Sequence, residues 1–449
     1  MMNETFDEEQ RKAIESDSKR ISVIATAGAG KTLVLSRRIE YLVINKAVSP
    51  NRILALTFTN KARDEMASRI GHIIEPGLVQ IQTLDSFAKY VYELFIGKRI
   101  SIKDESDDGE DAYTFEEIRH LAVKALSDRD FRISFSYQYD HILVDEFQDV
   151  EEIMFTMINS ILNEDNCLFV VGDDDQNVYR WRGAESKYLI HFKDSFPVGE
   201  VIILDKCFRC SGNIVDVMNT LINYNKIRYP KIIVTDNPQG YPVMYRHFHY
   251  FEDEVQYIIS EIKHLISIGY KLSEIAVLYR RNSFVNKAIE IMLSFGLSDI
   301  NVTTIHAAKG EQYRAVFVPS LNEGILPLTE NRANNTEDER RALFVAISRA
   351  KERLYLSSFT CMIDKGHSET YKESRFIREI KDRIATVKQG VSYYIPKALE
   401  CGKRYYYLAT GKNIVFICLN GDKYIFGDES ARELALTQKE VLRWVRVIR

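Results

Sequence analysis

The sequence predicts an α/β fold built from two parallel-sheet domains with a cleft between them. Short apolar runs alternate with helical patterns along most of the chain, and the runs fall into two sets. Buried-type strands separated by helices are typical of parallel sheets joined by right-handed crossovers. The chain has 449 residues, of which 45% are hydrophobic and 11% aromatic, so it can bury two compact cores.

The expected strands follow from apolar runs of four to seven residues. We expect the first sheet to contain strands at residues 21–25, 53–59, 79–83, 141–145 and 168–172. We expect the second sheet to contain strands at residues 201–204, 275–279, 302–306, 315–319 and 353–357. The stretches between these runs have helical patterns.

Two regions depart from this alternation. Residues 88–139 read as a small, mostly helical insertion in the first domain, and the acidic run 104–111 within it reads as a solvated loop. Residues 386–449 read as a small α+β extension. In it, 413–427 predicts a hairpin around Asn420-Gly421, a type I′ turn pair, and 436–447 predicts a short helix.

Composition limits the classes of function. The net charge is −4 with 28% charged residues, so a broadly basic nucleic-acid-binding surface is excluded and any such site must be local. We see no signal segment and no membrane-spanning run, and therefore expect a cytoplasmic protein without a membrane partner. Cys207 and Cys210 form a single Cys-x-x-Cys without a second pair, which favours ordinary thiols over a zinc site.

A phosphate-binding loop is the strongest local signal. Residues 25–32 read ATAGAGKT between an apolar strand and a helix. Gly28 and Gly30 let backbone N–H groups close on phosphate oxygens, and the helix N-terminus adds a positive dipole. Lys31 is expected to neutralise the β- and γ-phosphates, and Thr32 to ligate Mg²⁺. A glycine-rich turn with an incidental lysine is the alternative, and the strand–loop–helix context disfavours it. The loop residues expected to bind ATP are Ala27, Gly28, Ala29, Gly30, Lys31 and Thr32.

Residues 142–149, ILVDEFQD, supply the second half of this site. An apolar strand ends in two carboxylates: Asp145 is expected to hold Mg²⁺, and Glu146 to act as general base toward the attacking water. A strand that merely ends in a charged turn would explain this segment alone, but not its place downstream of a phosphate loop. The parts together predict ATP hydrolysis with Mg²⁺, which kinases, GTPases and motors share.

Further motifs, taken in order, resemble the superfamily 1 helicases of the UvrD/Rep/PcrA type, from about residue 6 to residue 380. They are TFTNKA at 57–62, QTLDSF at 82–87, GDDDQNVYRWRGA at 172–184, TTIHAAKG at 303–310 and RRALFVAISR at 340–349. The resemblance implies two RecA-like domains, with residues 1–87 and 140–199 in the first and 200–385 in the second. It leaves 88–139 as a reduced insertion, 282–301 as a vestigial insertion site and 386–449 as a C-terminal extension.

The resemblance also implies roles around ATP. Gln10 would read adenine, Phe208 would stack on it, Arg38 would lie along the nucleotide, and Gln312 would contact the ribose in place of the family's glutamate. The residues implied to act on the γ-phosphate are Gln176, Arg209 and Arg349, and by these bounds Arg209 and Arg349 belong to the second domain.

Aromatic and polar residues of the same motifs are implied to contact single-stranded DNA. Stacking on unpaired bases tolerates any sequence, which suits a motor; for Trp181, a place in the core is the alternative. Asp85 stands where the family usually has histidine, so the resemblance does not carry a DNA contact over to it. The implied DNA contacts are Phe58, Thr59, Asn60, Thr83, Ser86, Phe87, Tyr179, Trp181, Arg182, Thr304 and His306.

The resemblance therefore implies an ATP-dependent 3′–5′ translocase or helicase acting on single strands and single-strand/duplex junctions. Because the second insertion is nearly absent, translocation is expected to be stronger than unwinding. The alternative is an ATP-gated, DNA-binding regulatory subunit that activates a partner such as a nuclease, in repair or antiphage defence. An RNA-directed enzyme ranks last, because no motif reads a 2′-hydroxyl.

Overall fold

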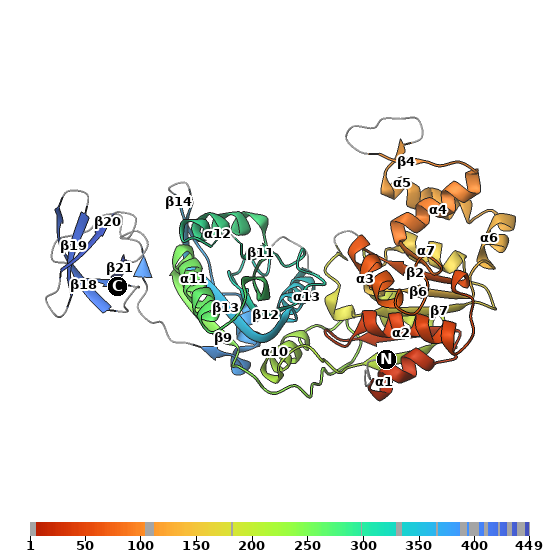
Figure 1. Cartoon of the computed structure of the whole chain (residues 1–449), viewed down its shortest axis with the longest axis horizontal. Coiled ribbons are helices and arrows are strands. Elements are labelled where there is room, and N and C mark those ends of the chain that lie inside the picture. The colour runs from red at the N-terminus through yellow and green to blue at the C-terminus, as the bar shows by residue number, and fades with distance from the viewer. Residues whose placement is uncertain are drawn as a thin grey trace. The chain divides into compact units, whose positions relative to one another are not determined.

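In the computed structural model of the chain, the described residues are 6–103, 112–180, 183–297, 299–328, 335–364, 367–386, 393–394, 404–407, 412–420, 423–428, 433–437 and 445–448. The chain divides into two compact units (Figure 1). Unit 1 comprises Met1–Arg209 and Asn225–Asp236, and unit 2 comprises Cys210–Tyr224 and Asn237–Arg449.

Unit 1 is built on a sheet of six parallel strands in the order β3-β2-β6-β7-β1-β8. The strands are β1 (Arg20–Ala25), β2 (Ile53–Thr57), β3 (Gln80–Thr83), β6 (His141–Val144), β7 (Cys167–Gly172) and β8 (Glu200–Leu204). Because every neighbouring pair is parallel, all carboxyl ends lie along one edge of the sheet, where ligands bind in such folds. This confirms a parallel α/β fold for the first half of the chain.

One strand belongs to a different sheet than expected. The run 201–204 was assigned to the second sheet, and the second domain was expected to begin at residue 200. The structure places β8 beside β1, with Val23 opposite Ile202, so this strand closes the first sheet. The alternation of strands and helices continues without a break here, so only the choice of hydrogen-bond partner shows where the first sheet ends.

Helices cover both faces of this sheet (Figure 1). One core joins it to α1 (Glu8–Glu15), α2 (Lys31–Ile44) and α3 (Asn60–Ile70). The other core joins it to α4 (Leu84–Ile96), α5 (Phe115–Ala125), α6 (Arg129–Ser136), α7 (Glu152–Ser160), α8 (Lys187–Ile190) and α9 (Phe192–Ser195).

The stretch 88–139 is mostly helical where it is described, as expected. It contains most of α4, the whole of α5 and α6, and a small parallel pair, β4 (Ser101–Ile102) with β5 (Ala112–Tyr113). Thr114 caps α5 and forms a reciprocal capping box with Glu117, which fixes where this helix begins. The acidic run at 104–111 lies outside the described residues.

Unit 2 contains a second, mostly parallel sheet in the order β11-β10-β12-β13-β9-β15. Strand β14 pairs antiparallel with β13. The strands are β9 (Met244–Tyr250), β10 (Ile275–Tyr279), β11 (Asn301–Thr304), β12 (Tyr313–Val318), β13 (Ala350–Asp364), β14 (His367–Thr370) and β15 (Ala385–Thr386). Strand β9 was not expected, because its sequence MYRHFHY is not an apolar run and most of its residues are only half-buried.

The helices of unit 2 pack around a core of aromatic and aliphatic residues. They are α10 (Gly212–Ile222), α11 (Phe251–Ser267), α12 (Asn282–Ser294), α13 (Asn335–Ile347) and α14 (Arg375–Glu379). Helix α12 occupies most of the range 282–301, which the resemblance marked as an insertion site, and follows β10 and precedes β11 in the chain. Among the described residues of both units, no helix combines the length and apolar character that crossing a bilayer requires.

The C-terminal extension forms an antiparallel sheet in the order β16-β21-β17-β18-β19-β20. Its strands are β16 (Tyr393–Tyr394), β17 (Arg404–Tyr407), β18 (Lys412–Asn420), β19 (Lys423–Asp428), β20 (Glu433–Thr437) and β21 (Val445–Ile448). The pairing of β18 with β19 confirms the expected hairpin.

The helix expected at 436–447 is wrong where that range is described, because strands β20 and β21 cover its two ends; residues 438–444 lie outside the described residues. The described part of the extension is therefore β rather than α+β. Leu434 and Leu436 face Phe426 and Tyr424 across the ladder. Packing of these two leucines against β19 favours a strand here, although the local apolar spacing is also compatible with a helix.

Candidate nucleotide site and nucleic-acid interface

The phosphate loop joins the end of β1 to the start of α2. Gly28 and Gly30 adopt φ angles of 79° and 80°, a left-handed conformation that favours glycine. The Ala29 N–H donates to the Thr26 carbonyl at 3.2 Å, which closes the loop. Helix α2 begins at Lys31, so its unpaired N–H groups and dipole point toward the loop. This geometry suits the binding of phosphate groups.

Gln10 lies directly against this loop. Its side chain completes a capping box with Asp7 at the start of α1, and its Nε2 donates to the Ala29 carbonyl at 3.0 Å. A Cβ on Gly30 would come within 3.2 Å of the same Nε2. The structure therefore brings Gln10 to the nucleotide site, where it also holds the loop in shape.

The segment after β8 closes on the other side of the loop. The Phe208 N–H donates to the Gly28 carbonyl at 3.0 Å, and a Cβ on Gly28 would come within 2.8 Å of the Arg209 Cβ and 2.9 Å of the Cys207 Sγ. The Phe208 ring is 45% exposed, with the Lys206 ammonium 5.3 Å from its centroid. Phe208 and Arg209 thus join the phosphate loop within unit 1, and Phe208 offers an open aromatic face.

The two expected carboxylates follow β6. Glu146 has a φ of 48° and places its Oε2 3.7 Å from the Lys31 Nζ. Asp145 is buried and accepts the Glu146 N–H at 2.8 Å. Burial, together with repulsion from Glu146, raises the pKa of Asp145 to about 7. An opposite charge near Asp145 would stabilise its ionised form.

The residues present fit a magnesium ion. The raised pKa of Asp145 reflects buried negative charge that the neighbouring Lys31 only partly compensates. A carboxylate and a hydroxyl are hard oxygen ligands of the kind Mg²⁺ prefers, so Asp145 and Thr32 would hold it. The ion would supply charge stabilisation to the phosphate oxygens.

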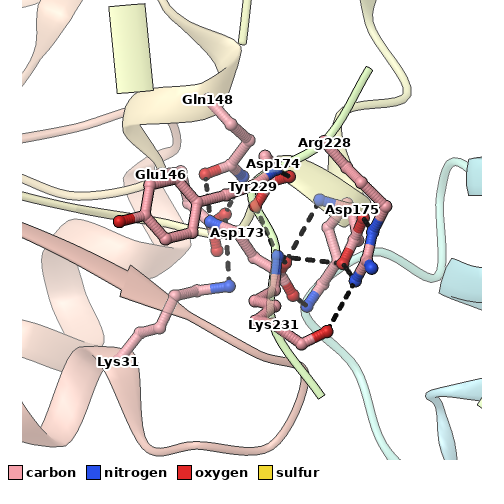
Figure 2. Close-up of polar contacts among 10 residues, drawn as sticks. Lys31, Glu146, Gln148, Asp173, Asp174, Asp175, Arg228, Tyr229 and Lys231 are labelled. Atoms are coloured by element: carbon pink, nitrogen blue, oxygen red, sulfur yellow. Dashed lines mark hydrogen bonds and ion pairs between the residues drawn. The ribbon is translucent and has the colours of Figure 1, made fainter. Parts of the chain in front are cut away.

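Gln148, which no sequence pattern singles out, connects the carboxylates with the loop after β7. Its Nε2 donates to the Glu146 Oε2, and its Oε1 accepts the Asp173 N–H at 2.9 Å. Gln176 lies in the same β7 loop, where its Nε2 donates to the Asp173 Oδ2 at 2.6 Å (Figure 2 shows Gln148, Glu146 and Asp173). The only sequence signal was the position of this glutamine two residues after Glu146, which does not reveal its partners.

Arg38 does not join the residues of the phosphate loop. It lies two turns into α2, about 10 Å along the helix axis from Lys31. Its side chain is buried, donates to the Ile14 carbonyl at 2.7 Å, and lies 5.6 Å from the Phe169 ring centroid. The expected position along the nucleotide is therefore corrected to a position in the core beneath α1.

The polar residues expected to contact DNA in unit 1 follow β2 and β3, on the same sheet edge as the phosphate loop. Thr59 and Asn60 are exposed at the start of α3, where Thr59 caps the helix, and Phe58 is half-buried. Thr83 caps α4, and its hydroxyl donates to the exposed Ser86 at 2.8 Å. These side chains form a polar row at the helix N-termini, which suits phosphate contacts.

The structure corrects the expected role of Phe87. It was expected to touch DNA, but it is 0% exposed and packs in the core, with its ring centroid 6.0 Å from that of Phe135. Asp85, which replaces the family's histidine, pairs with Arg119 of α5 at 3.4 Å. This ion pair ties helices α4 and α5 together.

Motif residues near residue 180 are only partly described. Tyr179 is half-buried, and its N–H donates to the Asn177 Oδ1 at 3.3 Å. Trp181 and Arg182 lie outside the described residues. The proposed stacking platform therefore stays a prediction.

In unit 2, Thr304 and His306 lie at the carboxyl end of β11, and both are half-buried. Gln312 is exposed just before β12. Arg349 precedes β13 and donates to the Val345 carbonyl at 3.0 Å and the Glu311 carbonyl at 3.2 Å. The structure thus places the guanidinium of Arg349 against the residue next to Gln312.

The fold and site define a nucleoside-triphosphate-binding α/β protein of the phosphate-loop class. The protein-family model of the UvrD/Rep helicase N-terminal domain matches residues 6–110 and 104–197 of the sequence. The family model of the UvrD-like helicase C-terminal domain matches residues 202–296 and 285–360. The chain belongs to the UvrD/Rep helicase family, with two RecA-like domains.

Curated relatives carry helicase names. The chain is 28% identical over 347 residues to the "ATP-dependent DNA helicase PcrA" of Staphylococcus epidermidis, covering 61% of this chain and 48% of the relative. PcrA of Bacillus subtilis is 29% identical over 363 residues, covering 64% and 49%. A "Probable DNA helicase" of Mycoplasma pneumoniae is 26% identical over 492 residues, covering 87% and 92%. The chain thus spans about half the length of the PcrA relatives it matches.

Proposed function

We propose that this chain is an ATP-dependent DNA translocase and helicase that moves 3′ to 5′ along single strands. One observation carries the proposal: Lys31 of a left-handed glycine loop faces Glu146 at 3.7 Å, with the buried Asp145 beside it, in a chain of the UvrD/Rep family. These are the groups that phosphoryl transfer to water requires.

Each group has one task in the proposed hydrolysis. Lys31 and the backbone of the phosphate loop bind the β- and γ-phosphates, and the exposed ring of Phe208 stacks on the base. Glu146 accepts a proton from the attacking water, which Gln176 helps to orient. Arg209 of unit 1 and Arg349 of unit 2 stabilise the charge on the transferring phosphoryl group.

DNA binding is proposed for polar and aromatic residues that follow strands in both units. In unit 1 they flank β2, β3 and β7, on the sheet edge that also carries the phosphate loop. A change in the nucleotide can therefore reach the DNA contacts through short loops of one sheet edge. The residues proposed to contact DNA are Phe58, Thr59, Asn60, Thr83, Ser86, Tyr179, Trp181, Arg182, Thr304 and His306.

The test measures ATP hydrolysis by the purified chain with and without oligo(dT), using Lys31→Ala as the inactive control. We expect oligo(dT) to stimulate wild-type hydrolysis at least about tenfold and Lys31→Ala to abolish it, because the lysine binds the transferred phosphate. Thermal unfolding checks that the variant is folded. Hydrolysis that persists in Lys31→Ala, or wild-type hydrolysis that ignores DNA, would contradict the proposal.

Matched DNA and RNA ligands test the direction of movement and the preferred nucleic acid. Duplexes with a 3′ or a 5′ single-stranded tail of equal length should differ, with unwinding or displacement of a bound protein only from the 3′ tail. RNA of the same sequence should stimulate hydrolysis less than DNA. Stimulation that requires an added partner such as a nuclease would instead identify a regulatory subunit.

A further inference from the structure

Three adjacent carboxylates lie on the loop that follows β7, the loop that also carries Gln176 of the proposed nucleotide site. Asp173, Asp174 and Asp175 are each fully buried, and their oxygens are close enough together to hold a metal ion. Three buried negative charges would be very unfavourable without a partner. The partner is therefore the feature to identify.

The chain itself supplies the cation. The Lys231 Nζ lies 3.2 Å from the Asp173 Oδ1 and 2.9 Å from the Asp175 Oδ2, and it also contacts the Asp174 Oδ1 (Figure 2). Arg228 adds a two-pronged contact to Asp175, at 2.9 and 2.8 Å. The ammonium group occupies the place a metal ion would take.

The charge state of Lys231 follows from this geometry. Burial by itself would lower the pKa of Lys231, but the three carboxylates outweigh burial and raise it well above its usual range. The ammonium is 0% exposed and stays charged at neutral pH. Lys231 therefore remains the positive partner of the three carboxylates at neutral pH.

The same cluster reaches the proposed catalytic groups. Lys231 holds one oxygen of Asp173, while the other oxygen accepts the Gln176 Nε2 at 2.6 Å. The Asp173 N–H donates to Gln148, whose amide donates to Glu146. A continuous chain of polar contacts therefore runs from Lys231 to the proposed general base.

The packing leaves little freedom along this path. A Cβ on Gly172 would come within 2.6 Å of the Gln148 Oε1 and 3.1 Å of the Gln148 N. The Asn177 Nδ2 also donates to the Gln148 carbonyl, at 2.8 Å. Gln148 is thus fixed from several sides, and a shift of Asp173 would be passed on to it.

Lys231 comes from an unusual place in the chain. It belongs to Asn225–Asp236, a stretch that packs in unit 1 although unit 2 residues precede and follow it in sequence. The Tyr229 N–H in the same stretch donates to the Asp174 Oδ2 at 2.7 Å. The cluster therefore fastens this returning segment to the loop that carries Gln176.

We propose that Lys231 is a positioning residue for ATP hydrolysis: through Asp173 it holds Gln176 and, through Gln148, Glu146 in their working places. This inference rests on the proposed ATPase function. It assigns to the returning segment a role in hydrolysis as well as in folding.

The first test is Lys231→Met, an apolar side chain of similar length. With saturating oligo(dT), we expect kcat to fall about tenfold or more while the KM for ATP changes less than about threefold, because phosphate-loop contacts remain. The matched control is Met157→Ala, which empties a buried core site on α7. It should lower the melting temperature and leave kcat within about twofold of wild type.

A double variant separates the effect on the positions of the catalytic groups from the effect on the stability of the fold. Lys231→Met combined with Asp174→Asn removes one charge of each sign, so it should regain most of the melting temperature that Lys231→Met loses. Its kcat should stay at least about fivefold below wild type, because Asp173 still lacks its lysine.

The outcomes are distinct. Recovery of both melting temperature and kcat in the double variant, or unchanged kcat in Lys231→Met, would overturn the positioning role. A kcat that falls in Met157→Ala as much as in Lys231→Met would overturn it too. A wild-type chain that hydrolyses no ATP would instead remove the proposed function, and this inference with it.

Discussion

Glu254 is a buried acid whose pKa differs between the folded and the unfolded chain. It lies on α11 with no exposed surface, and it accepts the Ser320 N–H at 2.8 Å and the Ser320 hydroxyl at 2.9 Å. Ser320 has a φ of 59°, an uncommon conformation for a residue other than glycine, just after β12. Glu254 therefore fastens the turn that leaves the central strand of unit 2.

This acid predicts a pH dependence of stability. Burial raises the pKa of Glu254 from 4.5 to about 7. The folded state then binds a proton that the unfolded state releases between these pH values. The stability contributed by this group is present below pH 4.5 and is lost as pH rises through about 7.

Glu254→Gln tests this at the residue scale. Glutamine keeps an acceptor for the Ser320 N–H and offers a donor to its hydroxyl, but it does not ionise. We expect the free energy of unfolding at pH 8 to rise relative to wild type, on the order of 3 kcal/mol, with little change at pH 4.5. Urea unfolding across this pH range measures it; equal effects at both pH values would contradict the prediction.

Helix α4 shows how one element serves both core and surface. Its first turn carries Ser86 on the exposed side and Phe87 on the buried side, one residue apart. Successive helical residues point about 100° apart, so neighbours in sequence have different surroundings. The motif QTLDSF therefore mixes a proposed DNA contact with a core residue.

Alanine substitutions should separate the two roles. Phe87→Ala is expected to lower the free energy of unfolding by about 3–5 kcal/mol, because it leaves a cavity beside Phe135. Ser86→Ala should change stability by less than about 0.5 kcal/mol and weaken binding of oligo(dT). Chemical denaturation and fluorescence anisotropy give both quantities. If Phe87→Ala stays stable and loses only DNA affinity, the core assignment fails.

At the scale of the whole molecule, the proposed ATPase groups are divided between the two units. Lys31, Glu146 and Arg209 belong to unit 1, whereas Arg349 belongs to unit 2. Within unit 2, the Arg349 guanidinium donates to two carbonyls and to the Ser348 hydroxyl, which fixes its direction. The Arg349 side chain is buried in unit 2, and each of its three guanidinium nitrogens donates to one of these acceptors.

Arg349→Lys tests the contribution of unit 2. Lysine keeps the positive charge but lacks the planar guanidinium with its several N–H donors. We therefore expect kcat to fall about a hundredfold, with a KM for ATP near that of wild type. Arg314→Lys is the matched control, because the Arg314 side chain pairs with Glu352 and Glu274 in the same unit and has no role in the proposed hydrolysis. Steady-state ATPase assays with oligo(dT) compare the two; equal activity in both variants would contradict a role for Arg349 in hydrolysis.

Much of unit 1 could be predicted from local sequence. The phosphate loop was identified because two left-handed positions demand glycine, and a strand before and a helix after complete the pattern. Asp145 and Glu146 were identified because they end an apolar strand. By contrast, neither Gln148 nor Lys231 follows a pattern that reveals its function, because both act through partners chosen by packing.

By itself, the sequence determined the chemistry of the site: which residues can grip phosphate, hold a cation and take up a proton. These properties depend on side-chain type and on short-range backbone geometry. Only the tertiary structure decided that β8 completes the first sheet, that Arg38 and Phe87 are buried, and that Lys231 pairs with the acids of the β7 loop. Each of these depends on contacts between residues far apart in the chain, whose energies no local pattern records.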